Sequence, residues 1–220
     1  MKLTVFGATG GVGREVLRQA LAAGWHVTAV ARNPAKLVGD VDAVQADLAD
    51  SERDTIAQAV RGADAVISAV GPTHRTDVGI AARATATIAD AMTAQEVRRL
   101  VVISAAPVGV MPSPQRNPPR YDPGDDWLMR YVLAPMILRI FPDVYRDLAA
   151  MEDLLRAGQL LWTAIRPPRL TNGPLTGTYR TAIDRNLPKG RTISRADVAQ
   201  VMVNVLHQPE TIRHTIGIAY

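Results

Sequence analysis

Three glycines near the start of the sequence are spaced so that they could hold a phosphate group. Gly7, Gly10 and Gly13 follow an apolar stretch, residues 3–6, and precede apolar residues at helical spacing. In such a strand-to-helix turn the first glycine permits a tight bend, the second lets a pyrophosphate approach, and the third lets the helix pack closely. Free N–H groups and the helix dipole favour an anion there. The alternative is a glycine-rich turn without a ligand. We predict that the pyrophosphate of a dinucleotide binds to Gly7, Ala8, Thr9, Gly10, Gly11, Val12 and Gly13.

Two basic residues follow the second expected strand, residues 25–31. Arg32 stands about 20 residues beyond the glycines, where an enzyme that uses NAD usually has Asp or Glu for the ribose hydroxyls. Lys36 follows one helical turn later. Both side chains can pair with a 2′-phosphate, Arg through its planar guanidinium. The pair predicts NADP(H) in preference to NAD(H), and the alternative is two solvated charges on a loop.

The ends of the later strands supply the remaining candidate residues. The carboxyl ends of parallel strands meet at one edge of a sheet, and a dinucleotide lies across that edge. We expect contacts from the ends of the third, fourth, fifth and sixth strands, namely Asp47 and Leu48, then Ala69, Val70 and Gly71, then Ser104, then Pro167, Pro168, Arg169 and Leu170.

Ser104 is the candidate catalytic residue because it follows the strand expected to face the nicotinamide. A serine there can hold a substrate carbonyl or an ordered water, and the alternative is a strand-end serine bonded to the backbone. A Tyr-x-x-x-Lys pair is absent, since Pro135 and Ala149 stand four places after Tyr131 and Tyr145. A reductase with this sequence therefore suits an acceptor such as a flavin or a quinone-like ring, which takes a hydride without a strong protein acid.

The order of the elements predicts an α/β fold. Strands and helices alternate at least five times, which indicates a doubly wound, Rossmann-type parallel sheet with helices on both faces, in a single domain over residues 1–220. The strands are expected near residues 3–6, 25–31, 41–46, 63–71, 100–104, 160–165 and 215–218, and the helices near 12–23, 52–61, 78–95, 126–140, 144–157 and 195–206.

Composition narrows the class of protein. The 220 residues are 47% hydrophobic and 21% charged, as in ordinary globular proteins. The lack of cysteine excludes thiol catalysis and disulfides, and four scattered histidines predict no metal site. A net charge of +4 without a run of Lys or Arg predicts no nucleic-acid partner. No apolar stretch reaches the ~18 residues of a membrane span, and the first residues do not resemble a signal peptide, so we expect a cytoplasmic protein.

We expect residues 105–142 to form an insertion on the substrate side, a variable segment that serves the substrate or acts as a lid. The insertion begins with a proline-rich stretch and continues into an apolar helix interrupted by Pro135. The apolar face, which includes Trp127 and Tyr131, fits a lid over the substrate or a homo-oligomer contact through residues 125–141. A helix on a membrane surface is a weaker fit because its charged face is poor. Plain core packing is the remaining alternative.

These motifs resemble those of the atypical short-chain dehydrogenase/reductases. The chain is similar to their flavin reductase (biliverdin IXβ reductase) branch and to the NmrA-like proteins, in segments 6–13, 166–168, 174–179 and 193–198. The resemblance implies that the glycine turn binds pyrophosphate, that Arg32 and Lys36 hold the 2′-phosphate, and that Ser104 and the Pro-Pro loop lie at the nicotinamide. That family also lacks the Tyr/Lys pair. Residues 105–142 look longer and more apolar than in the flavin reductases, so the acceptor does not carry over.

Two functions follow from these observations. The first is an NADPH-dependent oxidoreductase that transfers a hydride from the nicotinamide to a flavin, quinone or similar conjugated acceptor. The second is an NADP(H)-sensing regulator, like the NmrA proteins, that binds the cofactor without catalysis. Open space beside the nicotinamide favours the enzyme, whereas a filled site and an exposed apolar helix favour the sensor.

Overall fold

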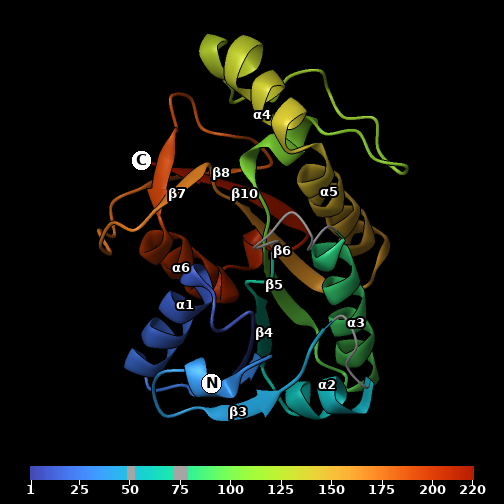
Figure 1. Ribbon diagram of the computed structural model, residues 1–220, viewed down its shortest axis with the longest axis vertical. Coiled ribbons are helices and arrows are strands. Elements are labelled where there is room, and N and C mark those ends of the chain that lie inside the picture. The colour runs from blue at the N-terminus through green and yellow to red at the C-terminus, as the bar shows by residue number, and fades with distance from the viewer. Residues whose placement is uncertain (49–52, 72–78) are drawn as a thin grey trace.

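A twisted sheet forms the centre of the computed structural model, which describes residues 1–48, 53–71 and 79–220 (Figure 1). In this part of the chain the sheet has eight strands. They are β1 (Lys2–Phe6), β2 (His26–Ala31), β3 (Asp42–Gln45), β4 (Ala65–Ser68), β5 (Arg99–Ile103), β6 (Leu161–Arg166), β8 (Arg180–Ile183) and β10 (His214–Ala219). Their spatial order is β3-β2-β1-β4-β5-β6-β10-β8, so the chain changes direction between β1 and β4. This order confirms the doubly wound α/β fold, and the glycine turn follows the strand at the reversal point.

One strand departs from the expected parallel sheet. Seven strands run parallel, but β8 pairs with β10 in the antiparallel sense. An antiparallel strand is common at the edge of such a sheet, where one side meets water, and three of the four β8 residues are exposed. Two further strands, β7 (Arg169–Thr171) and β9 (Thr192–Ser194), form a separate parallel pair.

Helices cover both faces of the sheet (Figure 1). One face carries α1 (Gly11–Ala22) and α6 (Arg195–Asn204), and the other carries α2 (Arg53–Val60), α3 (Ile80–Ala94) and α5 (Pro142–Ala157). Short single-turn helices are η1 (Pro34–Lys36), η3 (Ala106–Val110), η5 (Val205–His207) and η6 (Pro209–Thr211). The expected helices are present with ends shifted by a few residues, and the expected helix starts at residues 52 and 78 lie outside the described residues.

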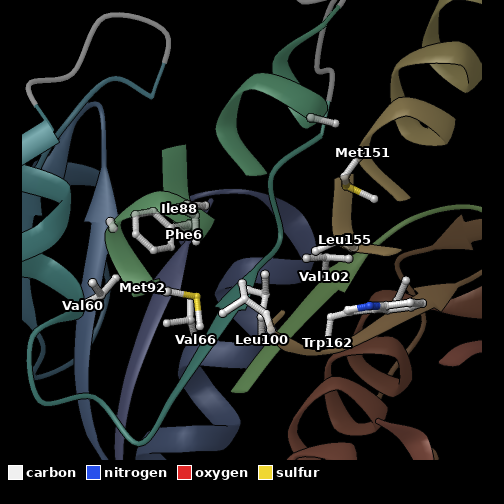
Figure 2. Close-up of a cluster of buried hydrophobic side chains, with 14 of the residues drawn as sticks. Phe6, Val60, Val66, Ile88, Met92, Leu100, Val102, Met151, Leu155 and Trp162 are labelled. Atoms are coloured by element: carbon white, nitrogen blue, oxygen red, sulfur yellow. The ribbon is translucent and has the colours of Figure 1, made fainter. Parts of the chain in front are cut away.

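The core lies in two layers because successive side chains of a strand point to opposite faces. In β1, Leu3 and Val5 pack on the side of α1 and α6, whereas Phe6 packs on the side of α2 and α3. Figure 2 shows Phe6 beside Ile88 and Met92, with other buried side chains of the same layer further along the sheet. Burial of each such side chain stabilises the fold by about 1.5–3 kcal/mol. These layers fix β1 and therefore the start of the glycine turn.

The insertion leaves the end of β5 and extends beyond the sheet edge. Its helical part contains a π-helical turn, η4 (Met129–Leu133), followed by α4 (Ala134–Ile140), which lies at the far end of the molecule from β3 (Figure 1). Pro135 has no N–H for the carbonyl of Tyr131, so a wider turn just before it keeps the helix continuous. Large apolar side chains along this segment are exposed, among them Trp127 at 70%. Core packing therefore does not explain the whole apolar face. Whether a substrate or a second subunit covers this face stays a prediction.

Asp147 on α5 closes the start of α3. The N-cap position of α3, Gly79, offers no side chain, and the Asp147 carboxylate instead accepts hydrogen bonds from the backbone N–H groups of Ala81 and Ala82, at 3.0 and 2.9 Å. Replacing Asp147 by Ala leaves two donors near the sheet edge without this partner. The free energy of unfolding is then expected to fall by about 1–3 kcal/mol.

Urea denaturation measures this loss as a lower midpoint with an unchanged slope. The control is Asp143→Ala, which removes an exposed ion pair with Arg146 on the same helix and should change stability by less than about 1 kcal/mol. Equal effects of the two substitutions would contradict the role assigned to Asp147.

Candidate functional site

The glycine turn between β1 and α1 has no room for side chains at two of its positions. Gly7 has φ +70°, and a Cβ atom there would lie 2.8 Å from the carbonyl carbon of Ala69 on the neighbouring chain segment. A Cβ at Gly13 would lie 2.1 Å from the carbonyl oxygen of Gly7. The turn is closed by a hydrogen bond from the N–H of Gly10 to the same oxygen, at 3.0 Å. The first and third glycines therefore fix the tight bend and the close approach of α1 to β1.

The start of α1 is open to an anion. Its N-cap residue, Gly10, makes no side-chain capping bond, and the first turn contains no acidic residue. The first backbone N–H groups of a helix have no partner within the helix, and they attract a negative group when no side chain caps them. The free N–H groups give this turn a partial positive charge, and no carboxylate in the first turn of α1 competes for them. A phosphate therefore fits the chemistry of the turn.

A cavity of about 430 Å³ opens beside this turn at the carboxyl ends of the strands. It joins the glycine turn to Arg32 after β2, to Asp47 and Leu48 after β3, and to the residues after β4. Most of the residues that line this cavity are therefore ones that the sequence analysis predicted. The lining residues are Gly7, Thr9, Gly10, Val30, Arg32, Ala46, Asp47, Leu48, Ala69, Val70, Gly71, Ile80 and Arg83.

Some predicted residues lie outside that cavity. Lys36 is exposed on η1, a single turn that begins after Arg32 and is capped by the side chain of Asn33. Pro167 is buried, Pro168 lines a narrow space beside Arg166, and Arg169 and Leu170 belong to β7. Conversely, Arg83 in the first turns of α3 was missed. Its only signal in the sequence is that α3 starts after β4, at the same edge of the sheet.

Ser104 has a buried charged partner that the sequence did not reveal. Its hydroxyl donates to Oε1 of Glu152 at 2.8 Å, and Nε of Arg166 donates to the same oxygen at 2.8 Å. The other carboxylate oxygen accepts from Nη2 of Arg166 at 2.5 Å and from Nη2 of Arg156 at 2.9 Å. Ser104 is 6% exposed and Glu152 is fully buried. The network ties the ends of β5 and β6 to α5.

The charges in this network set the role that Ser104 can take. Burial by itself would raise the pKa of Glu152, but the guanidinium of Arg166, with Arg156 and the Ser104 hydroxyl, lowers it to about 2. The pKa of Arg166 is raised in turn, since the adjacent Glu152 carboxylate outweighs its burial. Glu152 is thus ionised at neutral pH and can only accept. The Ser104 hydroxyl donates its proton to Glu152. The serine oxygen can therefore only accept a further hydrogen bond.

Asp197 anchors the loop that follows β7. Its carboxylate accepts from the backbone N–H groups of Thr176 and Gly177, both at 2.9 Å, and from the hydroxyl of Tyr220 at 2.6 Å. Ser194 caps α6 by accepting from the N–H of Asp197 and donates its own hydroxyl to that carboxylate. Burial raises the pKa of Asp197, but these hydrogen bonds outweigh it and the pKa is lowered. Segment 193–198 therefore holds segment 174–179 in place.

The fold and this site define the chain as a dinucleotide-binding protein of the doubly wound class. A glycine turn that opens onto a helix start and a cavity along the carboxyl ends of parallel strands is the arrangement that such proteins use. The family described as NAD(P)H-binding matches residues 7–209, and the chain belongs to this family.

Individual relatives match this chain over nearly their whole length. The Bacillus subtilis (strain 168) protein YwnB is 27% identical over 223 residues, which cover 96% of this chain and 94% of YwnB. A Veillonella parvula short-chain dehydrogenase/reductase of the wide type, solved in complex with NADP, is 18% identical, with a TM-score of 0.78 over 100% of this chain and 94% of its own. A Streptococcus pneumoniae protein described as a candidate NADH-flavin reductase is 23% identical, with a TM-score of 0.76 over 100% and 99%. At these identities the two structures establish the shared fold.

These comparisons confirm the sequence-based identification of the chain as an NAD(P)-binding protein with a Rossmann-type fold. Within the described ranges, none of the helices combines the length and the apolar character needed to cross a bilayer.

The buried ion pair yields a prediction on stability and pH. Glu152→Gln leaves the guanidinium of Arg166 buried without a counter-charge, so the free energy of unfolding at pH 7 should fall by about 3–5 kcal/mol. The folded-state pKa of Glu152 is about 2, below its ordinary 4.5. Its contribution is therefore complete above about pH 4.5 and is lost as the pH falls through 2. The difference between wild type and variant should narrow from pH 5 downward.

Denaturant unfolding at pH 7, 5 and 3 measures this difference. Glu15→Gln is the control, because Glu15 pairs with Arg18 on the surface and should contribute less than about 1 kcal/mol at any of these pH values. A constant difference between wild type and Glu152→Gln across the pH range would contradict the assigned ionisation.

Proposed function

We propose that this protein is an NADPH-dependent oxidoreductase that transfers a hydride from the nicotinamide to a flavin, a quinone or a similar conjugated acceptor. The observation that carries the proposal is the cavity in which the glycine turn and Arg32 share one wall. The turn suits a diphosphate, and a guanidinium at the end of β2 suits a second phosphate on the adenosine ribose. Membership of the NAD(P)H-binding family supports the cofactor class.

The preference for NADP(H) rests on the charge at the end of β2. Arg32 is exposed at the cavity and forms no ion pair with the described residues, so its guanidinium can receive a phosphate. Lys36 follows on η1 and adds a second positive charge nearby. Asp or Glu at position 32 would repel the 2′-phosphate and favour NAD(H) instead. The Veillonella parvula structure with NADP shows that a protein of this fold accommodates that cofactor.

The chemistry proposed for the site needs no proton donor from a side chain at the nicotinamide. The bound nicotinamide would supply the hydride. The glycine turn and Arg32 would hold the two ends of the adenosine diphosphate part, and Ser104, with its proton held by Glu152, would present an oxygen that accepts a hydrogen bond. An acceptor with a conjugated ring system suits this arrangement. The description of the Streptococcus pneumoniae relative as a candidate NADH-flavin reductase supports this acceptor class.

A second function, NADP(H) sensing without catalysis, is favoured by the exposed apolar side chains of the insertion. The side chains of Tyr131, Met136 and Ile140 are about half exposed, and that of Trp127 is exposed still further. A regulator that reports its cofactor state to another protein needs such a contact surface. The cofactor loops serve both functions equally, so turnover decides between them.

Cofactor titration tests the proposed specificity. We expect NADPH to bind more tightly than NADH. Arg32→Ala should weaken NADPH by about 10- to 100-fold, the value of one hydrogen-bonded charge pair, and should leave NADH within about twofold. Arg146→Ala, which removes an exposed guanidinium on α5, is the control for net charge and should change neither affinity. Equal binding of the two cofactors by the wild type would rule out the role of Arg32.

A screen of hydride acceptors tests the activity. NADPH oxidation, followed by the absorbance of the reduced nicotinamide, should accelerate with free flavins or quinones in the presence of the wild-type protein. Gly10→Leu should abolish it, because even a Cβ at Gly10 would lie 3.2 Å from the Gly7 carbonyl oxygen and a larger side chain would fill the phosphate position. Tight NADPH binding without turnover of any acceptor would refute the reductase and support the sensor.

A further inference from the structure

Arg195 reaches the glycine turn from the opposite end of the sequence. It is the first residue of α6, which packs beside α1 (Figure 1). A Cβ atom on Gly11 would lie 2.6 Å from Cδ and 2.8 Å from Nε of Arg195. The Arg195 side chain therefore occupies the space that a side chain at position 11 would need.

This contact explains a glycine that the dinucleotide motif does not require. In the Gly-x-x-Gly-x-x-Gly pattern, position 11 is unconstrained. Gly11 is also absent from the glycines of the described chain that have positive φ, so its backbone conformation is open to other residues. A side chain at Gly11 would therefore require the Arg195 side chain to move from its present position.

The Arg195 side chain is held over the turn without a counter-charge. Its Nη1 donates to Oδ1 of Asn172, the residue after β7, at 2.6 Å, and it forms no ion pair with any carboxylate in the described part of the chain. Asp197 supplies a carboxylate in the same helical turn, but this carboxylate accepts from Ser194, Gly177 and Tyr220 rather than from Arg195. The side-chain amide of Asn172 fixes one edge of the Arg195 guanidinium. The other N–H groups of the guanidinium remain available to donate to an acceptor.

We propose that Arg195, positioned by Asn172, binds the diphosphate of the cofactor at the glycine turn, and that Gly11 is glycine to admit it. The inference rests on the proposed dinucleotide function and adds to it a specific cation. The planar guanidinium suits phosphate oxygens, and its place beside the first residue of α1 puts it next to the N–H groups that face the same anion. The diphosphate would thus be held between two helices rather than by α1 alone.

The test compares two ligands that differ in the diphosphate. NADPH contains it, whereas adenosine 2′-monophosphate has the adenine, the ribose and the 2′-phosphate only. Arg195→Ala should weaken NADPH by about 10-fold or more while leaving adenosine 2′-monophosphate within about twofold. Arg195→Lys, which keeps the charge without the planar fork, should recover part of the loss. Gly11→Ala should also weaken NADPH selectively, since the added methyl group displaces the Arg195 side chain.

Controls separate this proposal from the cofactor assignment. Arg18→Ala removes an exposed guanidinium of α1 and should change neither affinity. Arg32→Ala should weaken both ligands, since both carry the 2′-phosphate. Unchanged NADPH affinity in Arg195→Ala, or an equal loss for both ligands, would overturn the role of Arg195 while leaving the cofactor assignment in place. Failure of the wild type to bind NADPH or NADH would instead overturn the proposed function itself.

Discussion

The contact between Gly13 and the carbonyl oxygen of Gly7 is the constraint on which the site depends. It brings α1 so close to the end of β1 that only hydrogen atoms fit between them. The start of α1 is thereby aimed at the carboxyl edge of the sheet, beside the ends of β2, β3 and β4. Two buried layers hold β1 from both faces, so the turn is presented by a rigid strand. A single backbone contact in this way decides where an anion can approach.

Charge is distributed unevenly around this edge. Beside the ends of β2, β3 and β4, Arg32 and Arg83 line an open cavity, and Arg195 approaches the glycine turn from α6. On the side of β5 and β6, Glu152 and Arg166 form a buried ion pair, and the partly exposed Arg156 donates to the same carboxylate. The first group gives this edge of the sheet a positive charge, which suits the anionic ligand of the proposed function. The second group fixes the strand ends and Ser104, and it gains strength from the low dielectric that burial creates.

The sequence predicted the parts of the structure that depend on local pattern. Alternation of strands and helices, the position of the glycine turn and the residues at strand ends all follow from the chemistry of neighbouring residues, and they account for the doubly wound fold and for most of one cavity wall. The sequence could not pair Ser104 with Glu152, because an isolated Glu on an amphipathic helix is ordinarily solvated. Nor could it place Arg195 on Gly11, which is 184 positions away in the sequence. Such contacts arise only when the sheet brings distant segments together. The antiparallel pairing of the short strand β8 with β10 likewise could not be predicted from the sequence.

The position of residues 105–142 along the chain has a structural consequence. Ser104 stands immediately before residues 105–142, and Glu152 lies a few turns beyond them on α5. The hydrogen bond between them therefore closes the insertion at its base, and the ion pair with Arg166 secures that closure from a third element. Residues 105–142 thus meet the sheet through a base of buried, hydrogen-bonded charges that is built from residues outside this segment.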